Sequence, residues 1–120
     1  MKTHKNLDAW KLSMALATKT YELTRAFPKE ELFGLTNQMR RAAISIPSNL
    51  AEGAGRSGDK EFLRFLYIAT GSASELDTQL EIARSVGLGN KEKLNETQKL
   101  TNQVARILQG LIRSIKARTQ

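Results

Sequence analysis

The residues of this sequence that could do chemistry are mainly arginines and lysines, and several stand at helical spacings. Lys99, Arg106 and Arg113 are each seven residues apart, so on a helix they share one face. A row of cations of this kind can neutralise phosphates without reading bases. We therefore take the following basic residues as candidate nucleic-acid-binding residues: Arg40, Arg41, Arg56, Lys60, Lys99, Arg106 and Arg113.

The balance of charge agrees with an anionic partner. Nineteen Lys and Arg face twelve Asp and Glu, which gives a net charge of +7, and nucleic acid is the first partner that such an excess suggests. Two alternatives stay open. A charge of this size also keeps an ordinary helical protein soluble, and some cations could be held in ion pairs on a solvated face, such as Arg64 with Asp59 or Glu61.

Enzyme chemistry is largely excluded by what the sequence lacks. There is no cysteine, and His4, the single histidine, stands at the start of the chain. A di-iron bundle needs Glu-x-x-His motifs on two helices, and none is present. The glycines at 53, 55 and 58 lack the strand and the Lys-Ser/Thr of a phosphate loop. We expect no catalytic residue, cofactor or metal, and the absence of cysteine fits a reducing cytoplasm.

Glu52 is a further polar candidate because it follows Pro47 in an otherwise apolar pattern and looks buried. One interpretation makes it a site residue. The other, which we favour, is structural: together with Ser48 and Asn49 it hydrogen-bonds backbone groups that the proline leaves unpaired.

Four helices must position these residues. Apolar residues recur with helical period over residues 7–27, 31–54, 59–86 and 91–116. Pro28 ends the first helix, Asn90 caps the fourth, and Pro47 lies inside the second, where it predicts a kink. Because the connections are short, neighbouring helices must run antiparallel. The sequence predicts one all-α domain over residues 1–120, an up-down-up-down four-helix bundle with helix two kinked near Pro47.

Several apolar residues lie outside the main apolar stripes of these helices. They are Leu12, Leu16, Leu63, Ile68, Leu100, Ile107 and Ile112. Scattered apolar residues are common on protein surfaces. We favour instead a second apolar face that serves self-association. No apolar run is long enough to cross a membrane, so we expect no membrane partner.

The segments FPKEELFGLTNQMRRAAISIPSNLAEGAGR and EFLRFLYIATGSASELDTQL resemble a known family. Its members are four-helix bundles encoded by intervening sequences within 23S ribosomal RNA genes, also labelled the S23 ribosomal protein family. The resemblance extends from LDAWK, which begins at Leu7, to LIRSIK, which ends at Lys116. The run from Ile46 to Gly53 is its most specific part.

This resemblance implies an antiparallel bundle that assembles into a ring, commonly a homopentamer. The family is also similar to the accessory variability protein of diversity-generating retroelements, a basic pentameric barrel that binds nucleic acid and a reverse transcriptase. The family offers no catalytic residues to transfer to this chain.

We consider two functions for such a chain. The first is a non-enzymatic, oligomeric bundle that binds RNA or DNA through phosphates, without strong sequence specificity. The alternative is a protein-protein interaction scaffold or adaptor, for example for a reverse transcriptase or another nucleic-acid enzyme.

Overall fold

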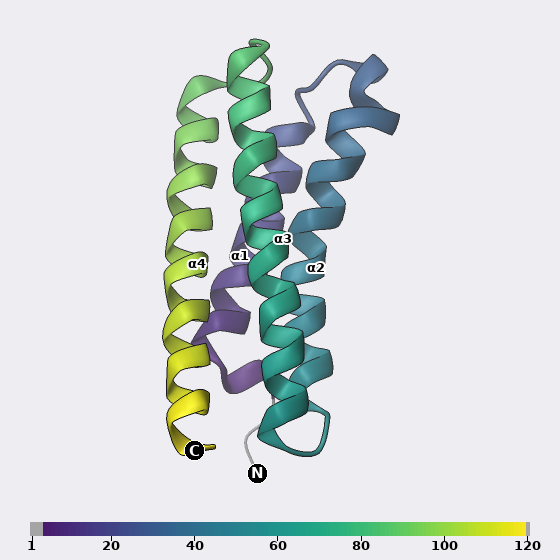
Figure 1. The fold of residues 1–120 in the computed structure, drawn as a ribbon. Coiled ribbons are helices and arrows are strands. Elements are labelled where there is room, and N and C mark those ends of the chain that lie inside the picture. Colours follow the sequence, from purple (N-terminus) through teal and green to yellow (C-terminus); the bar gives the residue numbers. More distant parts are fainter. Residues whose placement is uncertain (1–3, 120) are drawn as a thin grey trace.

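Four long α-helices dominate the computed structural model, which describes residues 4–119 (Figure 1). The elements in chain order are a 3₁₀ turn η1 (His4–Asn6), α1 (Asp8–Thr24), a 3₁₀ turn η2 (Lys29–Glu31), a π-helical turn η3 (Leu32–Thr36), α2 (Asn37–Ala54), α3 (Asp59–Ser85) and α4 (Lys91–Arg118). No strand occurs between residues 4 and 119. The predicted all-α fold class is confirmed.

The helices stand side by side around one shared core. Each packs against two neighbours, in the cyclic order α1, α2, α3, α4. The α2–α3 turn lies at the same end as the start of α1 and the end of α4, whereas the other two connections lie at the opposite end (Figure 1). Consecutive helices therefore run in opposite directions. Ion pairs link α1 to α4 through Lys19 and Glu96 (3.3 Å), and α3 to α4 through Asp59 and Arg118 (2.9 Å).

The core is built from the apolar stripes of all four helices. Its largest fully buried apolar side chains are Leu16, Leu23, Met39, Ile46, Leu50, Leu66, Leu76, Leu80, Val104, Leu108 and Ile115. Three of the residues that we assigned to a second apolar face, Leu16, Leu100 and Ile112, belong to this core, at 0%, 9% and 4% exposure. The assignment was wrong for them because a bundle helix contacts two neighbours and buries a stripe wider than one seam.

Two helix boundaries differ from those predicted by three residues or more. α1 ends at Thr24, not Phe27, and Phe27 is buried in the connection that follows. α2 begins at Asn37, not residue 31, because the π-helical turn η3 precedes it. Within that turn Gly34 has φ −115° and ψ −115°, which lie outside the helical region. Glycine has no Cβ and tolerates this conformation, so the turn departs from the helical path there.

The segment around Pro47 is α-helical on both sides of the proline, and Pro47 itself is buried. The expected kink at this residue stays a prediction. The Asn49 side chain donates to the Ser45 carbonyl oxygen (2.8 Å), and the Ser45 hydroxyl lies 2.8 Å from that of Ser72 on α3.

Glu52 is not the buried residue that the apolar pattern suggested. Its side chain is 52% exposed and forms an ion pair with Arg56 at 2.9 Å. It sits on the outer face of α2, next to the helix end, where a carboxylate and an arginine four residues apart meet in water.

Gly53 sets how closely α2 approaches α3. A Cβ built on it would lie 2.8 Å from the Cβ of Phe65 and 2.9 Å from Cδ1 of Phe62. The backbone of α2 therefore lies directly against two aromatic side chains of α3. By contrast, Gly71 lies in the middle of α3, and a Cβ there would meet nothing within 4 Å.

We predict that Gly53→Ala destabilises the protein, whereas Gly71→Ala stabilises it. At position 53 the added methyl group overpacks the helix contact. The resulting loss in free energy of unfolding, about 1–3 kcal/mol, exceeds the gain from the higher helix propensity of alanine. At position 71 only that gain remains, about 0.5–1 kcal/mol. Urea unfolding followed by circular dichroism measures both changes. Equal shifts for the two variants would contradict the close approach at Gly53.

Candidate nucleic-acid interface

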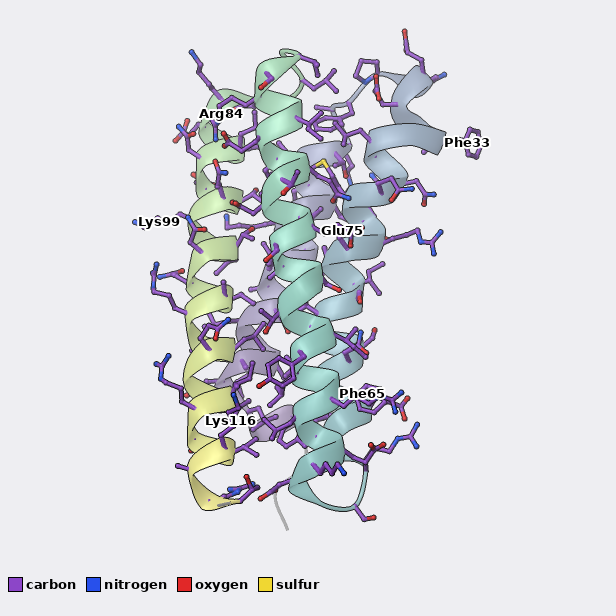
Figure 2. All side chains as sticks on the ribbon, in the orientation of Figure 1. Phe33, Phe65, Glu75, Arg84, Lys99 and Lys116 are labelled. Carbon is purple, nitrogen blue, oxygen red and sulfur yellow. The ribbon has the colours of Figure 1, made fainter. Side chains whose placement is uncertain are left out.

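The outer face of α4 carries three of the predicted basic residues in one exposed row. Leu94, Val104 and Leu108 are buried on the side of α4 that faces the core, so the opposite side faces solvent. Lys99, Arg106 and Arg113 lie exposed on that side, and Figure 2 shows Lys99 pointing away from the bundle. Seven residues of helix span about 10 Å, so the three cations form a row along the helix. We call it the α4 basic stripe.

The stripe is not neutralised by any carboxylate of residues 4–119. No carboxylate in the described part of the chain lies within 4.0 Å of any of its three cations. After Glu96, α4 contains no acidic residue. Its basic residues beyond that point are Lys99, Arg106, Arg113, Lys116 and Arg118. Arg118 pairs with Asp59, and the other four have no carboxylate within 4.0 Å among the described residues. The second half of α4 therefore presents positive charge that is largely uncompensated.

A shallow hollow of about 430 Å³ lies on this face, lined by Ala105, Arg106, Gln109 and Arg113. Nη2 of Arg113 lies 3.8 Å from the position that a Cβ on Gly110 would occupy, so the guanidinium is folded back along the helix. The hollow thus has an arginine at each end and an amide between them. Guanidinium groups donate in a planar fork that matches phosphate oxygens.

The remaining predicted residues do not join the stripe. Arg40 is half-buried between α1 and α2: its Nε donates to Thr24 Oγ1 (2.9 Å), and its guanidinium carbon lies 4.5 Å from the ring centroid of Tyr21. Arg41 is exposed on α2, which packs against α1 and α3 rather than α4.

The two predicted residues near the α2–α3 turn are also separate from the stripe. Arg56 is paired with Glu52, and its guanidinium lies 5.3 Å from the ring centroid of Phe65. Lys60 is exposed on the first turn of α3. The seven candidates thus occupy several surfaces of the molecule, and the sequence could not show this because it does not reveal which helices adjoin.

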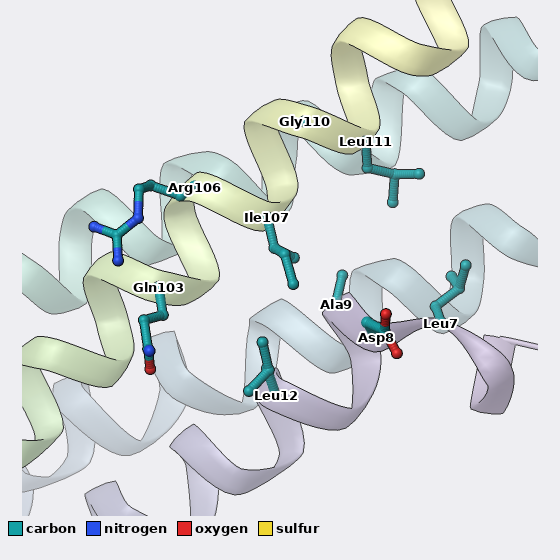
Figure 3. Close-up of a pocket in the computed structure, with 9 residues that line it drawn as sticks. All are labelled: Leu7, Asp8, Ala9, Leu12, Gln103, Arg106, Ile107, Gly110 and Leu111. Atoms are coloured by element: carbon teal, nitrogen blue, oxygen red, sulfur yellow. The ribbon is translucent and has the colours of Figure 1, made fainter.

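An apolar groove between α1 and α4 adjoins the stripe, and it was not predicted from the sequence. Its volume is about 710 Å³, and its lining residues are Leu7, Asp8, Ala9, Leu12, Gln103, Arg106, Ile107, Gly110 and Leu111. Figure 3 shows Leu12 of α1 and Ile107 of α4 projecting into the gap between the two helices. Arg106 lines both this groove and the basic hollow. The sequence signal that could have indicated this groove was the pair Leu12 and Ile107, both of which lay outside the main apolar stripes.

Asp59 and Arg118 join the start of α3 to the end of α4. Arg118 donates from Nε and Nη2 to the two carboxylate oxygens of Asp59, both at 2.9 Å. These hydrogen bonds lower the pKa of Asp59 and raise the pKa of Arg118. A bidentate pair of this kind is directional, so Arg118 is engaged with Asp59 and is not part of the free basic surface.

The described residues include no group of three or more His, Asp or Glu side chains placed to hold a metal ion. Among the same residues, no helix is long and apolar enough to cross a membrane.

Four helices and no strand over residues 4–119 define an all-α bundle. Residues 5–110 match the family described as 23S rRNA-intervening sequence protein, and the chain belongs to that family. No curated protein matches the chain. A solved structure with the same fold is that of a protein of unknown function from the S23 ribosomal protein family of Bacteroides thetaiotaomicron. It has a TM-score of 0.80 and 21% identity, over 88% of this chain and 95% of that chain.

We predict that Asp59→Asn lowers the melting temperature at pH 7 and has a smaller effect at pH 3. A carboxylate whose pKa is lowered in the folded state stabilises the fold above its unfolded pKa, about 4. That stabilisation disappears as the pH falls through the lowered value. Thermal unfolding at the two pH values measures it. Arg118→Gln should behave in the same way, and the double variant should lose no more than either single one.

Proposed function

We propose that the protein is a non-enzymatic, oligomeric helical bundle that binds RNA or DNA through phosphate contacts, without strong sequence specificity. One observation carries this proposal: the α4 basic stripe, Lys99, Arg106 and Arg113, is exposed, lies on one face and has no carboxylate partner among the described residues. The family is named for intervening sequences of 23S rRNA, and this association with RNA supports the proposal.

The form of the stripe favours phosphates over bases. Its three cations are spread about 20 Å along a straight helix, a length that extends over several nucleotides. Contacts of this kind fix a nucleic acid in place but carry no sequence information. Each phosphate that is neutralised releases counterions, so affinity must fall steeply with salt.

We predict that the triple variant Lys99→Gln, Arg106→Gln, Arg113→Gln weakens binding to a mixed-sequence RNA at low salt. Because three side chains no longer neutralise phosphates in this variant, the slope of log K against log salt should become shallower by about 2–3. Fluorescence anisotropy with a labelled RNA and a labelled DNA, over a series of salt concentrations, measures the slope.

The control is a second triple variant, Arg25→Gln, Lys29→Gln, Lys91→Gln, which removes the same net charge from exposed positions outside the stripe. This control variant should retain nearly the wild-type slope of log K against log salt. Equal reductions in both variants would mean that net charge alone attracts the nucleic acid, and a wild-type affinity that does not change with salt would overturn phosphate binding.

Self-association, as a homopentamer, is the second part of this proposal. Large apolar side chains remain exposed on the single chain, namely Met14, Leu32, Phe33, Ile44, Tyr67, Ile68, Ile82 and Val86. A ring would cover some of this surface and would present one basic stripe per copy, so that several weak phosphate contacts act together. The ring size of five comes from the family resemblance. Light scattering after size-exclusion chromatography tests it.

The alternative function is a scaffold or adaptor for a nucleic-acid enzyme such as a reverse transcriptase, and the apolar groove between α1 and α4 favours it. A protein partner seated there would still bind the triple variant of the stripe if its contacts are mainly apolar. Its binding would be abolished by Ile107→Arg, which places a charge inside the groove.

A further inference from the structure

Phe33 is the most exposed large apolar side chain of the described residues, at 92%, and its neighbour Leu32 is 46% exposed. Both lie on the π-helical turn η3, and Figure 2 shows Phe33 projecting away from the bundle. They follow directly after Glu30 and Glu31. We call residues 30–33 the knob: two carboxylates followed by two apolar side chains that the fold holds out into water.

The α1–α4 groove has the complementary composition. Its apolar lining is provided chiefly by Leu7, Leu12, Ile107 and Leu111, and Arg106 lies at its edge. At about 710 Å³ the groove is large enough to admit an aromatic side chain. Aromatic anchors in apolar pockets, with arginine beside them, are typical centres of protein interfaces.

We infer that the groove of one copy of this chain receives Leu32 and Phe33 from the knob of a second copy. Apolar surface meets apolar surface, while Glu30 and Glu31 come towards Arg106 and the uncompensated positive charge of α4. The groove also holds one acidic residue, Asp8, and the residue before the knob is basic, Lys29. A contact between these two residues would add a second pairing of opposite charges across the interface.

The two surfaces lie at different places on one chain. The knob precedes α2 at one end of the bundle, whereas the groove lies between α1 and α4, towards the end where α1 starts (Figure 1). A chain cannot fill its own groove with its own knob. The contact is head-to-tail, and it closes into a ring when the rotation between copies permits. This inference rests on the self-association part of the proposed function and not on nucleic-acid binding.

A complementation experiment tests the contact. Phe33→Ser removes the knob at a position that is almost fully exposed, and Ile107→Arg blocks the groove. Each variant alone should lose the wild-type assembly and elute as a 13.4 kDa monomer. An equimolar mixture should form a dimer of twice that mass, because the intact knob of the Ile107→Arg copy fits the intact groove of the Phe33→Ser copy.

Light scattering after size-exclusion chromatography gives these masses, and circular dichroism confirms that each variant is folded. Val86→Ser, at another exposed apolar residue (63%), is the matched control and should keep the wild-type mass. If Ile107→Arg does not fold, Leu111→Arg takes its place. Charge reversal provides a second arm: Glu30→Arg with Glu31→Arg should weaken the assembly, and Arg106→Glu should restore it.

An assembly that persists in Phe33→Ser, or a mixture that stays monomeric, would overturn the inference while leaving self-association through another surface intact. A monomeric wild type would overturn both. The folded Phe33→Ser variant should bind RNA more weakly than the ring does, because fewer stripes act together. The salt dependence of that remaining binding tests the nucleic-acid part of the proposed function.

Discussion

The close packing of α2 against α3 is the contact on which the rest of the bundle depends. It is the most extensive helix–helix contact in the structure, and Gly53 allows the backbone of α2 to lie against Phe62 and Phe65. A hydrogen bond between Ser45 and Ser72 joins the same two helices further along. Helices separated by small residues approach closely. This pair therefore forms the closely packed half against which α1 and α4 complete the core.

The opposite pair, α1 and α4, is built differently, and this explains why the candidate sites lie there. Larger side chains such as Leu12, Ile107 and Leu111 stand between these helices and are only partly buried. They leave an open groove instead of a closed seam. Because α4 places its core residues on one side, Lys99, Arg106 and Arg113 are left on the opposite side, and Arg106 borders the groove. Apolar recognition and positive charge are thereby adjacent.

Much of this architecture could be predicted from the sequence, since apolar period and helix caps are local signals. The boundaries of α3 were predicted to within one residue, and the Asn90 side chain accepts from the Lys93 amide as a cap should. The π-helical turn was missed because apolar spacing continues through Gly34 although the backbone leaves the helix there. The candidate site was predicted only in part. Which cations share a surface depends on helix adjacency, and Arg40 is held by Tyr21 and Thr24, contacts that spacing along one helix cannot reveal.

Arg106 is the point where the two proposed activities meet, since it lines both the basic hollow and the groove. If a docked knob and a bound phosphate both engage this guanidinium, each must weaken the other by the same factor. Lys99 and Arg113 do not line the groove, so the competition affects one phosphate contact of three in each copy. Against that reduction, a ring holds several stripes together, and a nucleic acid that spans two copies gains from their high effective concentration. Assembly should therefore favour long nucleic acids over those short enough to contact one copy.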